Sequence, residues 1–222
     1  DALISVEWFE AAIDAHTKLG FKAEGPIICA HDPSDLGPDA KGYAKRQGSV
    51  ILDVQEKLTG DTNEGMDWAM DRARNDNADW FVWDGDGIGL GLRRQVMQAL
   101  DGTKVEYEMF RGSEGAEDPM LYYGGDKGRT NKDTFLNRRA QYYWKLRDRF
   151  EATWRAVTKG EYIDPEQLIS VSSNIEYLDQ LRSEVTRIPQ KRSNNGKLQV
   201  LSKVDMKKKP YQIESPNLAD AL

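Results

Sequence analysis

Apolar residues in the first half of the chain alternate between helical spacing and short continuous runs. Roughly every third or fourth position is apolar at 3–16, which predicts a helix there. The apolar run at 25–31 is too short for an ordinary helix and predicts a buried strand. Two alternating segments at 42–46 and 49–58, joined by a Gln-Gly turn, predict a hairpin. The same reasoning predicts helices at 64–75 and 89–100 and strands at 79–83 and 104–110.

The second half of the chain contains one long helical pattern and one long irregular segment. Residues 111–132 are rich in glycine and charge, which predicts an exposed loop insertion. Residues 133–157 predict a long helix. Weaker patterns predict short helices at 165–169 and 175–182 and strands at 185–189 and 198–201. We therefore expect a lead-in helix within 1–24 and one larger domain over 25–222, with 111–132 as its insertion.

The order of these elements indicates the fold class. Three antiparallel strands are followed by helices that alternate with parallel strands, an order that resembles the sheet of ribonuclease H-like proteins. We therefore predict an α/β fold with a mixed sheet, strand order βββαβαβ, flanked by helices and carrying the glycine-rich insertion. In such a sheet the fourth strand lies parallel beside the first, so the carboxyl ends of 25–31 and 79–83 share one edge.

Acidic residues follow both of those strands. Asp32 and Asp84 are 52 positions apart in the chain, yet the shared sheet edge brings them together. Taken singly, each is more typical of a turn than of a metal site. Neighbouring carboxylates without partners repel each other and attract cations, and a third acid makes a metal site the better explanation. Asp220 is a candidate for that third acid, although spacing alone does not place it.

The available side chains favour magnesium or manganese as the metal. Carboxylate oxygens are hard ligands, and the chain has only two histidines and one cysteine, which argues against zinc. Two such ions roughly 3.5 to 4 Å apart activate a water molecule and stabilise the leaving 3′ oxygen of a phosphodiester. We expect Asp32 to bridge the ions, with Asp84 and Asp220 on the two flanks. The secondary candidates for metal ligands are Asp35, Asp86 and Asn217.

Charge and composition indicate a binding partner and a cellular compartment. The net charge is −6, but seven basic residues and one acid lie between Lys191 and Lys209, so an acidic body carries one basic strip. Such a strip suits a nucleic-acid backbone. The single cysteine, Cys29, lies in an apolar run and predicts a reducing compartment, the cytoplasm. No apolar run approaches the roughly 18 residues of a membrane span, so we expect no membrane association. The absence of an initiating Met and the helix-like ending at Leu222 indicate an excised fragment.

The chain as a whole resembles the nuclease domain of the large terminase subunit of tailed phages or prophages. The motifs that carry the resemblance are the lead-in at 3–13, the Asp-Pro strand end at Asp32, the Trp83–Gly89 turn, the segment Asn137–Asp148 and the closing Ser215–Leu222. The resemblance implies that Asp32, Asp84 and Asp220 bind the metal ions. Where many relatives have Asp or His, this chain has Asn217, a weaker neutral ligand.

The same resemblance implies a biological role and partners. The intact protein would move viral DNA into a procapsid, and this domain would cut concatemeric double-stranded DNA. Its partners would be a packaging ATPase, a small terminase subunit and a portal. No G-x-x-x-x-G-K-[ST] motif is present, so we expect no ATP hydrolysis here. The residues expected to contact DNA phosphates are Lys203, Lys207, Lys208, Lys209, Lys197 and Arg192.

Two other functions fit the same sequence features. One is a junction resolvase or integrase-type nuclease with the same fold, which would prefer branched or end-specific substrates. The other is a DNA-binding or docking module whose acids are structural, so that it binds DNA without cutting it. Metal-dependent cleavage of unbranched duplex distinguishes the expected endonuclease from both.

Overall fold

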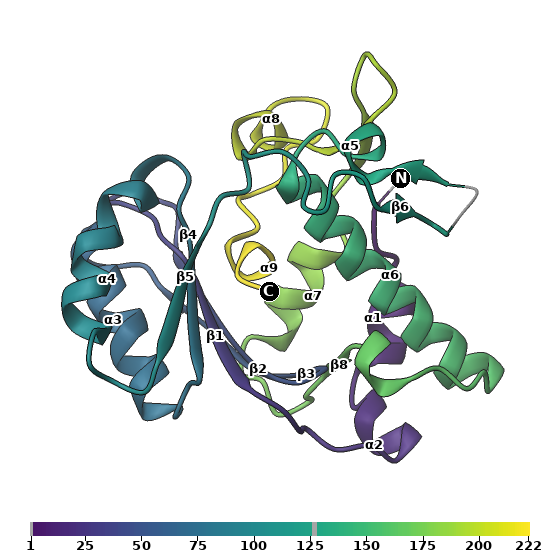
Figure 1. Ribbon diagram of the computed structural model, residues 1–222, viewed down its shortest axis with the longest axis horizontal. Coiled ribbons are helices and arrows are strands. Elements are labelled where there is room, and N and C mark those ends of the chain that lie inside the picture. Colours follow the sequence, from purple (N-terminus) through teal and green to yellow (C-terminus); the bar gives the residue numbers. More distant parts are fainter. Residues whose placement is uncertain (1, 126–127) are drawn as a thin grey trace.

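A six-stranded mixed sheet forms the centre of the molecule (Figure 1). The structure, a computed structural model, describes residues 2–125 and 128–222. The strand order is β5-β4-β1-β2-β3-β8. The strands are β1 Ile27–Asp32, β2 Lys41–Gln47, β3 Val50–Lys57, β4 Trp80–Asp84, β5 Glu106–Phe110 and β8 Ser170–Val171.

The parallel pairing of β1 with β4 confirms the expected ribonuclease H-like arrangement. Ile28 lies opposite Trp80, and the register continues until His31 lies opposite Trp83. β2 and β3 form the expected antiparallel hairpin on the other side of β1. Both parallel strands therefore end at the same edge of the sheet, each on an aspartate.

Helices cover both faces of the sheet and enclose two separate cores (Figure 1). On one face, α3 Thr62–Asn75 and α4 Arg93–Leu100 pack against β1 and β4. On the other face, α1 Val6–Ala12, α6 Arg138–Lys159 and α7 Leu178–Val185 pack against β2, β3 and β8. α3 begins with a reciprocal cap, in which the Asp61 and Glu64 side chains each accept the other residue's backbone N–H.

Shorter elements surround the carboxyl edge of the sheet and its flanks. The short helices are α2 Ala15–Leu19, η1 Gly87–Leu92, α5 Asn131–Thr134, η2 Pro165–Gln167, α8 Lys203–Lys207 and α9 Asn217–Asp220. The short strands form two hairpins, β6 Tyr122–Tyr123 with β7 Arg129–Thr130 and β9 Gln190–Arg192 with β10 Leu198–Val200. No helix in the described part of the chain combines the length and apolar character needed to cross a membrane.

Two helices that the sequence predicts as continuous are interrupted. The expected helix at 3–16 breaks after α1, because Ile13 forms a bridge to Val171 at the sheet edge and Asp14 takes a left-handed backbone conformation with φ of 51°. The expected helix at 133–157 is divided into α5 and α6, because Phe135 between them bridges to Leu198. In both cases a tertiary strand contact replaces helical hydrogen bonds.

Other differences concern element ends and short strands. The helix expected at 89–100 begins as the 3₁₀ helix η1 and becomes α-helical only at Arg93. The helix expected at 175–182 is α7, which extends to Val185, so the strand expected at 185–189 is displaced to β9. β8 is only two residues long, and no sequence pattern predicts it, because its strand character comes from pairing with β3. The insertion at 111–132 is mainly loop, and two of its residues, 126 and 127, lie outside the described part.

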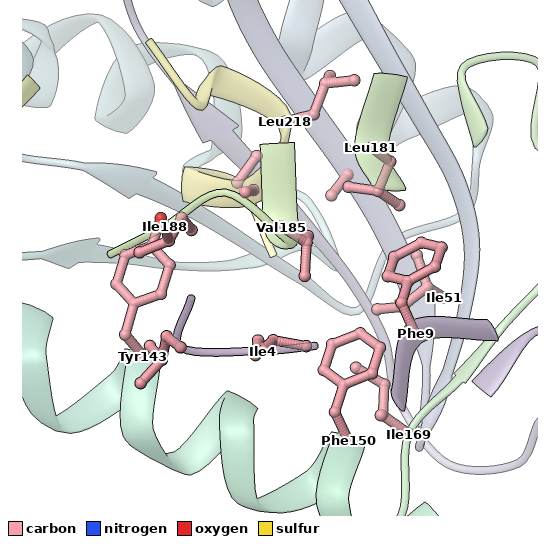
Figure 2. Packing of buried hydrophobic residues seen from close by; sticks show 14 of the residues in the cluster. Ile4, Phe9, Ile51, Tyr143, Phe150, Ile169, Leu181, Val185, Ile188 and Leu218 are labelled. Carbon is pink, nitrogen blue, oxygen red and sulfur yellow. The ribbon is translucent and has the colours of Figure 1, made fainter. Parts of the chain in front are cut away.

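The lead-in residues belong to the main core. Figure 2 shows Ile4 and Phe9 packed with Phe150 of α6 and Ile169, which come from distant parts of the chain. Phe9 and Phe150 stack with their ring centroids 5.6 Å apart, and both side chains are fully buried. This contact joins α1 to α6, the helix that also reaches the carboxyl edge of the sheet.

We predict that Phe150→Ala lowers the free energy of unfolding by about 3–5 kcal/mol, because it removes a fully buried ring and leaves a cavity. Urea unfolding followed by circular dichroism measures the change. Tyr162→Ala, at a side chain that is 92% exposed, is the control and should shift stability by less than about 0.5 kcal/mol. Equal losses for the two variants would contradict the assigned core.

Candidate active site

The ends of β1 and β4 direct two aspartates to the same face of the sheet. Phe81 and Trp83 of β4 are buried in the core under α3 and α4. Because successive side chains alternate along a strand, Asp84 faces the opposite side. Asp32 follows His31 and faces that side for the same reason, and its side chain is 2% exposed. The two carboxylates thus lie at equivalent positions on neighbouring parallel strands.

The short helix α9 adds Asp220 to this edge, and α6 fixes its side chain. Arg139 Nη2 donates to Asp220 Oδ1 over 2.9 Å. The Tyr143 hydroxyl donates to the same oxygen. Arg139 and Tyr143 are four positions apart on α6, so they lie on one face of the helix, one turn from each other. The Asp220 side chain is 7% exposed.

A lysine ammonium lies between the carboxylates. Lys203, the first residue of α8, places Nζ 2.6 Å from Asp32 Oδ2 and 3.2 Å from Asp220 Oδ2. The same nitrogen is 3.5 Å from Asn217 Oδ1. Asp32, Asp220 and Asn217 therefore surround a single positive charge, although Lys203 is 171 positions from Asp32 in the chain.

Burial and mutual repulsion shift the pKa values of the three acids. Burial raises the pKa of Asp32, and the attraction of Lys203 opposes this shift. Burial acts in the same direction on Asp220, but the charges of Arg139 and Lys203 outweigh it and hold its pKa below the usual range. The pKa of Asp84 is also raised, chiefly by burial. Repulsion from Asp220 adds to the upward pKa shifts of Asp32 and Asp84, so a cation near these two carboxyls stabilises their charged forms.

Backbone packing fixes the turn that follows Asp84. Asp84 Oδ1 accepts the backbone N–H of Asp86 over 2.9 Å, which leaves Oδ2 for other ligands. η1 begins directly afterwards and passes so close that a Cβ on Gly89 would lie 1.8 Å from the Asp84 carbonyl oxygen. A glycine is required there because a backbone atom cannot yield as a flexible side chain can.

The donor set fits a hard divalent cation. It consists of carboxylate and amide oxygens, and the buried Oδ2 of Asp220 accepts no hydrogen bond despite its proximity to Lys203. Within the described residues, no group of three or more Asp, Glu, His or Cys side chains is arranged so that it could hold a metal ion. Lys203 occupies the space where the oxygens of Asp32 and Asp220 would converge on an ion.

A cavity of about 230 Å³ opens beside the acids, between the sheet and α6. Asp84 and Asp220 line it together with Arg139, and Val82 and Phe110 form part of its apolar wall. The carboxylates are thus buried beneath the protein surface without being sealed from an incoming ligand.

Comparison with solved structures identifies the family. A point mutant of the nuclease domain of the large terminase subunit gp2 of bacterial virus Sf6, solved with manganese and beta-thujaplicinol, is 51% identical, with a TM-score of 0.95, over 100% of this chain and 96% of that one. A second structure of that domain is 50% identical with a TM-score of 0.94 over the same shares. The chain belongs to the nuclease domains of phage large terminase subunits. This confirms the family that the sequence motifs indicated.

More distant comparisons support less. The large terminase nuclease from thermophilic phage G20c with bound magnesium is 12% identical, with a TM-score of 0.50 over 100% of this chain and 97% of that one, and supports the fold alone. No protein-family model and no curated protein matches the chain.

The secondary acids of this terminase nuclease domain are engaged elsewhere. Both Asp86 oxygens accept hydrogen bonds from Ser113, at 2.7 Å from its backbone N–H and 2.6 Å from its hydroxyl. Asp86 thus ties the start of the 111–132 insertion to the sheet. Asp35 is exposed, and the backbone of Leu36 and the side chain of Thr62 at the start of α3 lower the pKa of its carboxyl. Of the three secondary candidates, only Asn217 contacts the group around Lys203.

The residues expected to contact DNA fall into three groups according to their ion-pair partners. Lys203 lies within the acid cluster, whereas Lys207 pairs with Asp39 at 2.7 Å and Lys208 with Asp205 at 2.9 Å. Among the described residues, the other three of the six have no ion pair: Arg192 and Lys197 on or beside the β9–β10 hairpin, and Lys209 after α8. Figure 1 shows α8 above α9, on the side of the sheet where β4 ends.

Sequence reasoning missed the roles of Arg139 and Tyr143. Both lie in the Asn137–Asp148 segment that supports the family resemblance, but the helical spacing of the aromatic residues there indicates core positions. One signal was present: an arginine and a tyrosine four positions apart share a helix face. That signal names no partner, because Asp220 lies 81 positions beyond Arg139.

We predict that Lys203→Ala tightens the binding of Mn²⁺ and Mg²⁺ to the isolated domain. The substitution removes the positive charge that a divalent cation must displace from between Asp32 and Asp220. Isothermal titration calorimetry without DNA measures the dissociation constant. Lys208→Ala, whose partner is the exposed Asp205, is the control and should behave as wild type. Weaker metal binding in Lys203→Ala would argue against this competition.

Proposed function

We propose that this terminase nuclease domain cuts double-stranded DNA during phage genome packaging, with divalent cations held by Asp32, Asp84 and Asp220. Membership of the family makes the chain a metal-dependent nuclease domain. One observation supports the residue assignment: Asp32 and Asp220 both contact the Lys203 ammonium. They do so at the sheet edge where β4 ends in Asp84.

The three acids would divide the work of holding two ions. Asp32 is central, since its strand lies between those of Asp84 and Gly42, and it is the best placed to contact both ions. Asp84 and Asp220 would each hold one flank, and Asn217 would add a neutral oxygen beside Asp220. Magnesium and manganese suit these ligands, and the Sf6 and G20c domains were solved with manganese and magnesium, respectively.

When bound, two such ions activate a water molecule and stabilise the 3′ oxygen that leaves phosphorus during in-line displacement. The protein side chains prepare the site for this. Arg139 and Tyr143 keep Asp220 ionised and direct its second oxygen inward. Lys203 must move away from Asp32, and its ammonium is then free to pair with a DNA phosphate. No side-chain nucleophile is needed.

DNA would reach the site over its basic margin. Arg192, Lys197 and Lys209 are the members of the expected DNA-binding set that lack an ion pair within the described residues, and Lys207 and Lys208 lie next to Lys209 in the chain. Contacts of this kind give affinity without base recognition, which suits an enzyme with little sequence preference. In the intact protein the partners would be the packaging ATPase, the small terminase subunit and the portal, and the substrate would be concatemeric viral DNA.

We predict that Asp32→Asn abolishes nicking of supercoiled plasmid in Mn²⁺, with a loss of at least about a thousandfold, because the shared ligand of both ions loses its charge. Agarose gels measure the cleavage. Wild type in EDTA should be equally inactive. Asp53→Asn, at a carboxylate of β3 that pairs with Arg72, is the matched control and should cut normally.

The choice of substrate separates the proposed function from its alternatives. A packaging nuclease should cut plasmid and linear duplex at similar rates, whereas a junction resolvase should prefer a four-way junction. A docking module should bind all three without cutting any of them. Persistent nicking by Asp32→Asn would show that the active centre lies elsewhere.

We predict that combining Arg192→Ala, Lys197→Ala and Lys209→Ala weakens duplex binding regardless of sequence. The slope of log affinity against log salt should become shallower by roughly 0.9 for each DNA phosphate that the variant no longer neutralises. Fluorescence anisotropy in EDTA, over a series of salt concentrations, measures both quantities. Lys104→Ala is the control, because Lys104 precedes β5 at the opposite edge of the sheet. An unchanged slope in the triple variant would remove these residues from the DNA surface.

A further inference from the structure

The helix that carries Asp220 is too short to hold itself in place. α9 is a single turn of four residues, and Pro216 at its start offers no side-chain acceptor for the first backbone N–H groups. The fixation of Asp220 by Arg139 and Tyr143 acts on the side chain, at Oδ1. Another part of the molecule must therefore fix the backbone of α9.

A carboxylate from α7 supplies the missing cap. Glu184 Oε2 accepts the backbone N–H of Leu218 over 2.8 Å and that of Ala219 over 3.1 Å. These are the orphan donors of the first turn of α9, and they lie one and two positions before Asp220. A residue distant in the chain thus performs the function that an N-cap residue normally performs from within the helix.

Glu184 is itself held in position from the sheet. Gln180, one turn earlier on α7, donates to Glu184 Oε1 over 3.1 Å and to Glu56 Oε2 of β3 over 2.8 Å. Apolar packing acts with this chain of polar contacts, because Leu181 and Val185 of α7 lie in the same buried cluster as Leu218 of α9 (Figure 2). The cap is therefore tied to the sheet that carries Asp32.

α9 also lies directly against the backbone of β2. A Cβ on Gly42 of β2 would lie 2.2 Å from the Asn217 carbonyl oxygen, so α9 rests directly on the strand backbone. Gly42 is also the residue opposite Asp32 in the sheet. α9 thus contacts both Glu184 and Gly42, and both contacts act at or next to the two residues that α9 contributes to the site.

We propose that Glu184 is a positioning residue for the metal site: as the tertiary cap of α9, it sets where the Asp220 carboxylate and the Asn217 amide meet the cation. This rests on the proposed function. Metal ligands must lie within about 0.2 Å of their required distances, so even a small shift of a one-turn helix lowers affinity. Among the described residues, the hydrogen-bond partners of Glu184 are Gln180 and the backbone N–H groups of Leu218 and Ala219, so it acts on Asp220 and Asn217 through the backbone of α9.

Metal affinity measured without DNA tests this role. Manganese binding to the domain is followed by electron paramagnetic resonance for wild type, Glu184→Ala, Glu184→Gln and Asp179→Asn. We expect Glu184→Ala to raise the dissociation constant about tenfold, the size of effect seen when a residue supporting metal ligands is removed. Glu184→Gln keeps one acceptor oxygen and should give an intermediate increase. Asp179, on the same helix with a 92% exposed side chain, is the control and should leave affinity unchanged.

A purely structural role for Glu184 predicts a different result. Glu184→Ala would then lower the melting temperature but, well below that temperature, bind manganese as wild type does, and this outcome overturns the proposal. If Glu184→Ala does not fold, Glu184→Gln decides, and wild-type affinity in that variant overturns the proposal. A failure of the proposed function would give a different result, because wild type and Asp32→Asn would then bind manganese with equal affinity. That result would contradict both the proposed metal site and the proposed role of Glu184.

Discussion

Repulsion between the carboxylates at the carboxyl ends of β1 and β4 is the constraint on which the rest of the site depends, because nearby cations must offset it. Two like charges about 4 Å apart near a protein surface repel by about 4 kcal/mol, a large share of the stability of a domain. Three acids here meet with little solvent around Asp32 and Asp220. The molecule balances this charge with Lys203 and Arg139, which reach the cluster from two different segments. A divalent cation bound between Asp32 and Asp220 would take the place of the Lys203 ammonium.

The fold divides the site into a rigid half and an assembled half. Asp32 and Asp84 are fixed by the parallel pairing of β1 with β4, so their spacing follows from the sheet itself. Asp220 lies on a single turn of helix, and its position depends on α6, α7 and β2 together. α6 is in turn anchored to α1 by the stacked rings of Phe9 and Phe150. The hydrophobic core between these helices therefore contributes to the geometry of the proposed metal site.

The part of this arrangement that could be predicted from the sequence is the part set by local pattern. The apolar runs that end in Asp32 and Asp84 predict both strands, and the order of elements predicts that they are neighbours. The surroundings of Asp220 could not be predicted this way, because no periodic pattern relates Arg139, Glu184 or Lys203 to it. Lys203 in particular belongs by composition to the basic strip, and only the tertiary structure brings it between the acids. The interrupted helices at Ile13 and Phe135 have the same cause, since their strand contacts are with residues far away in the chain.

Anomalous diffraction from crystals of the domain soaked in manganese tests the central claim most directly. We expect two anomalous peaks bounded by the carboxylates of Asp32, Asp84 and Asp220, with the Lys203 ammonium moved out of the space between Asp32 and Asp220. Peaks at any other group of acids, or Lys203 still bound to both carboxylates at saturating manganese, would contradict it.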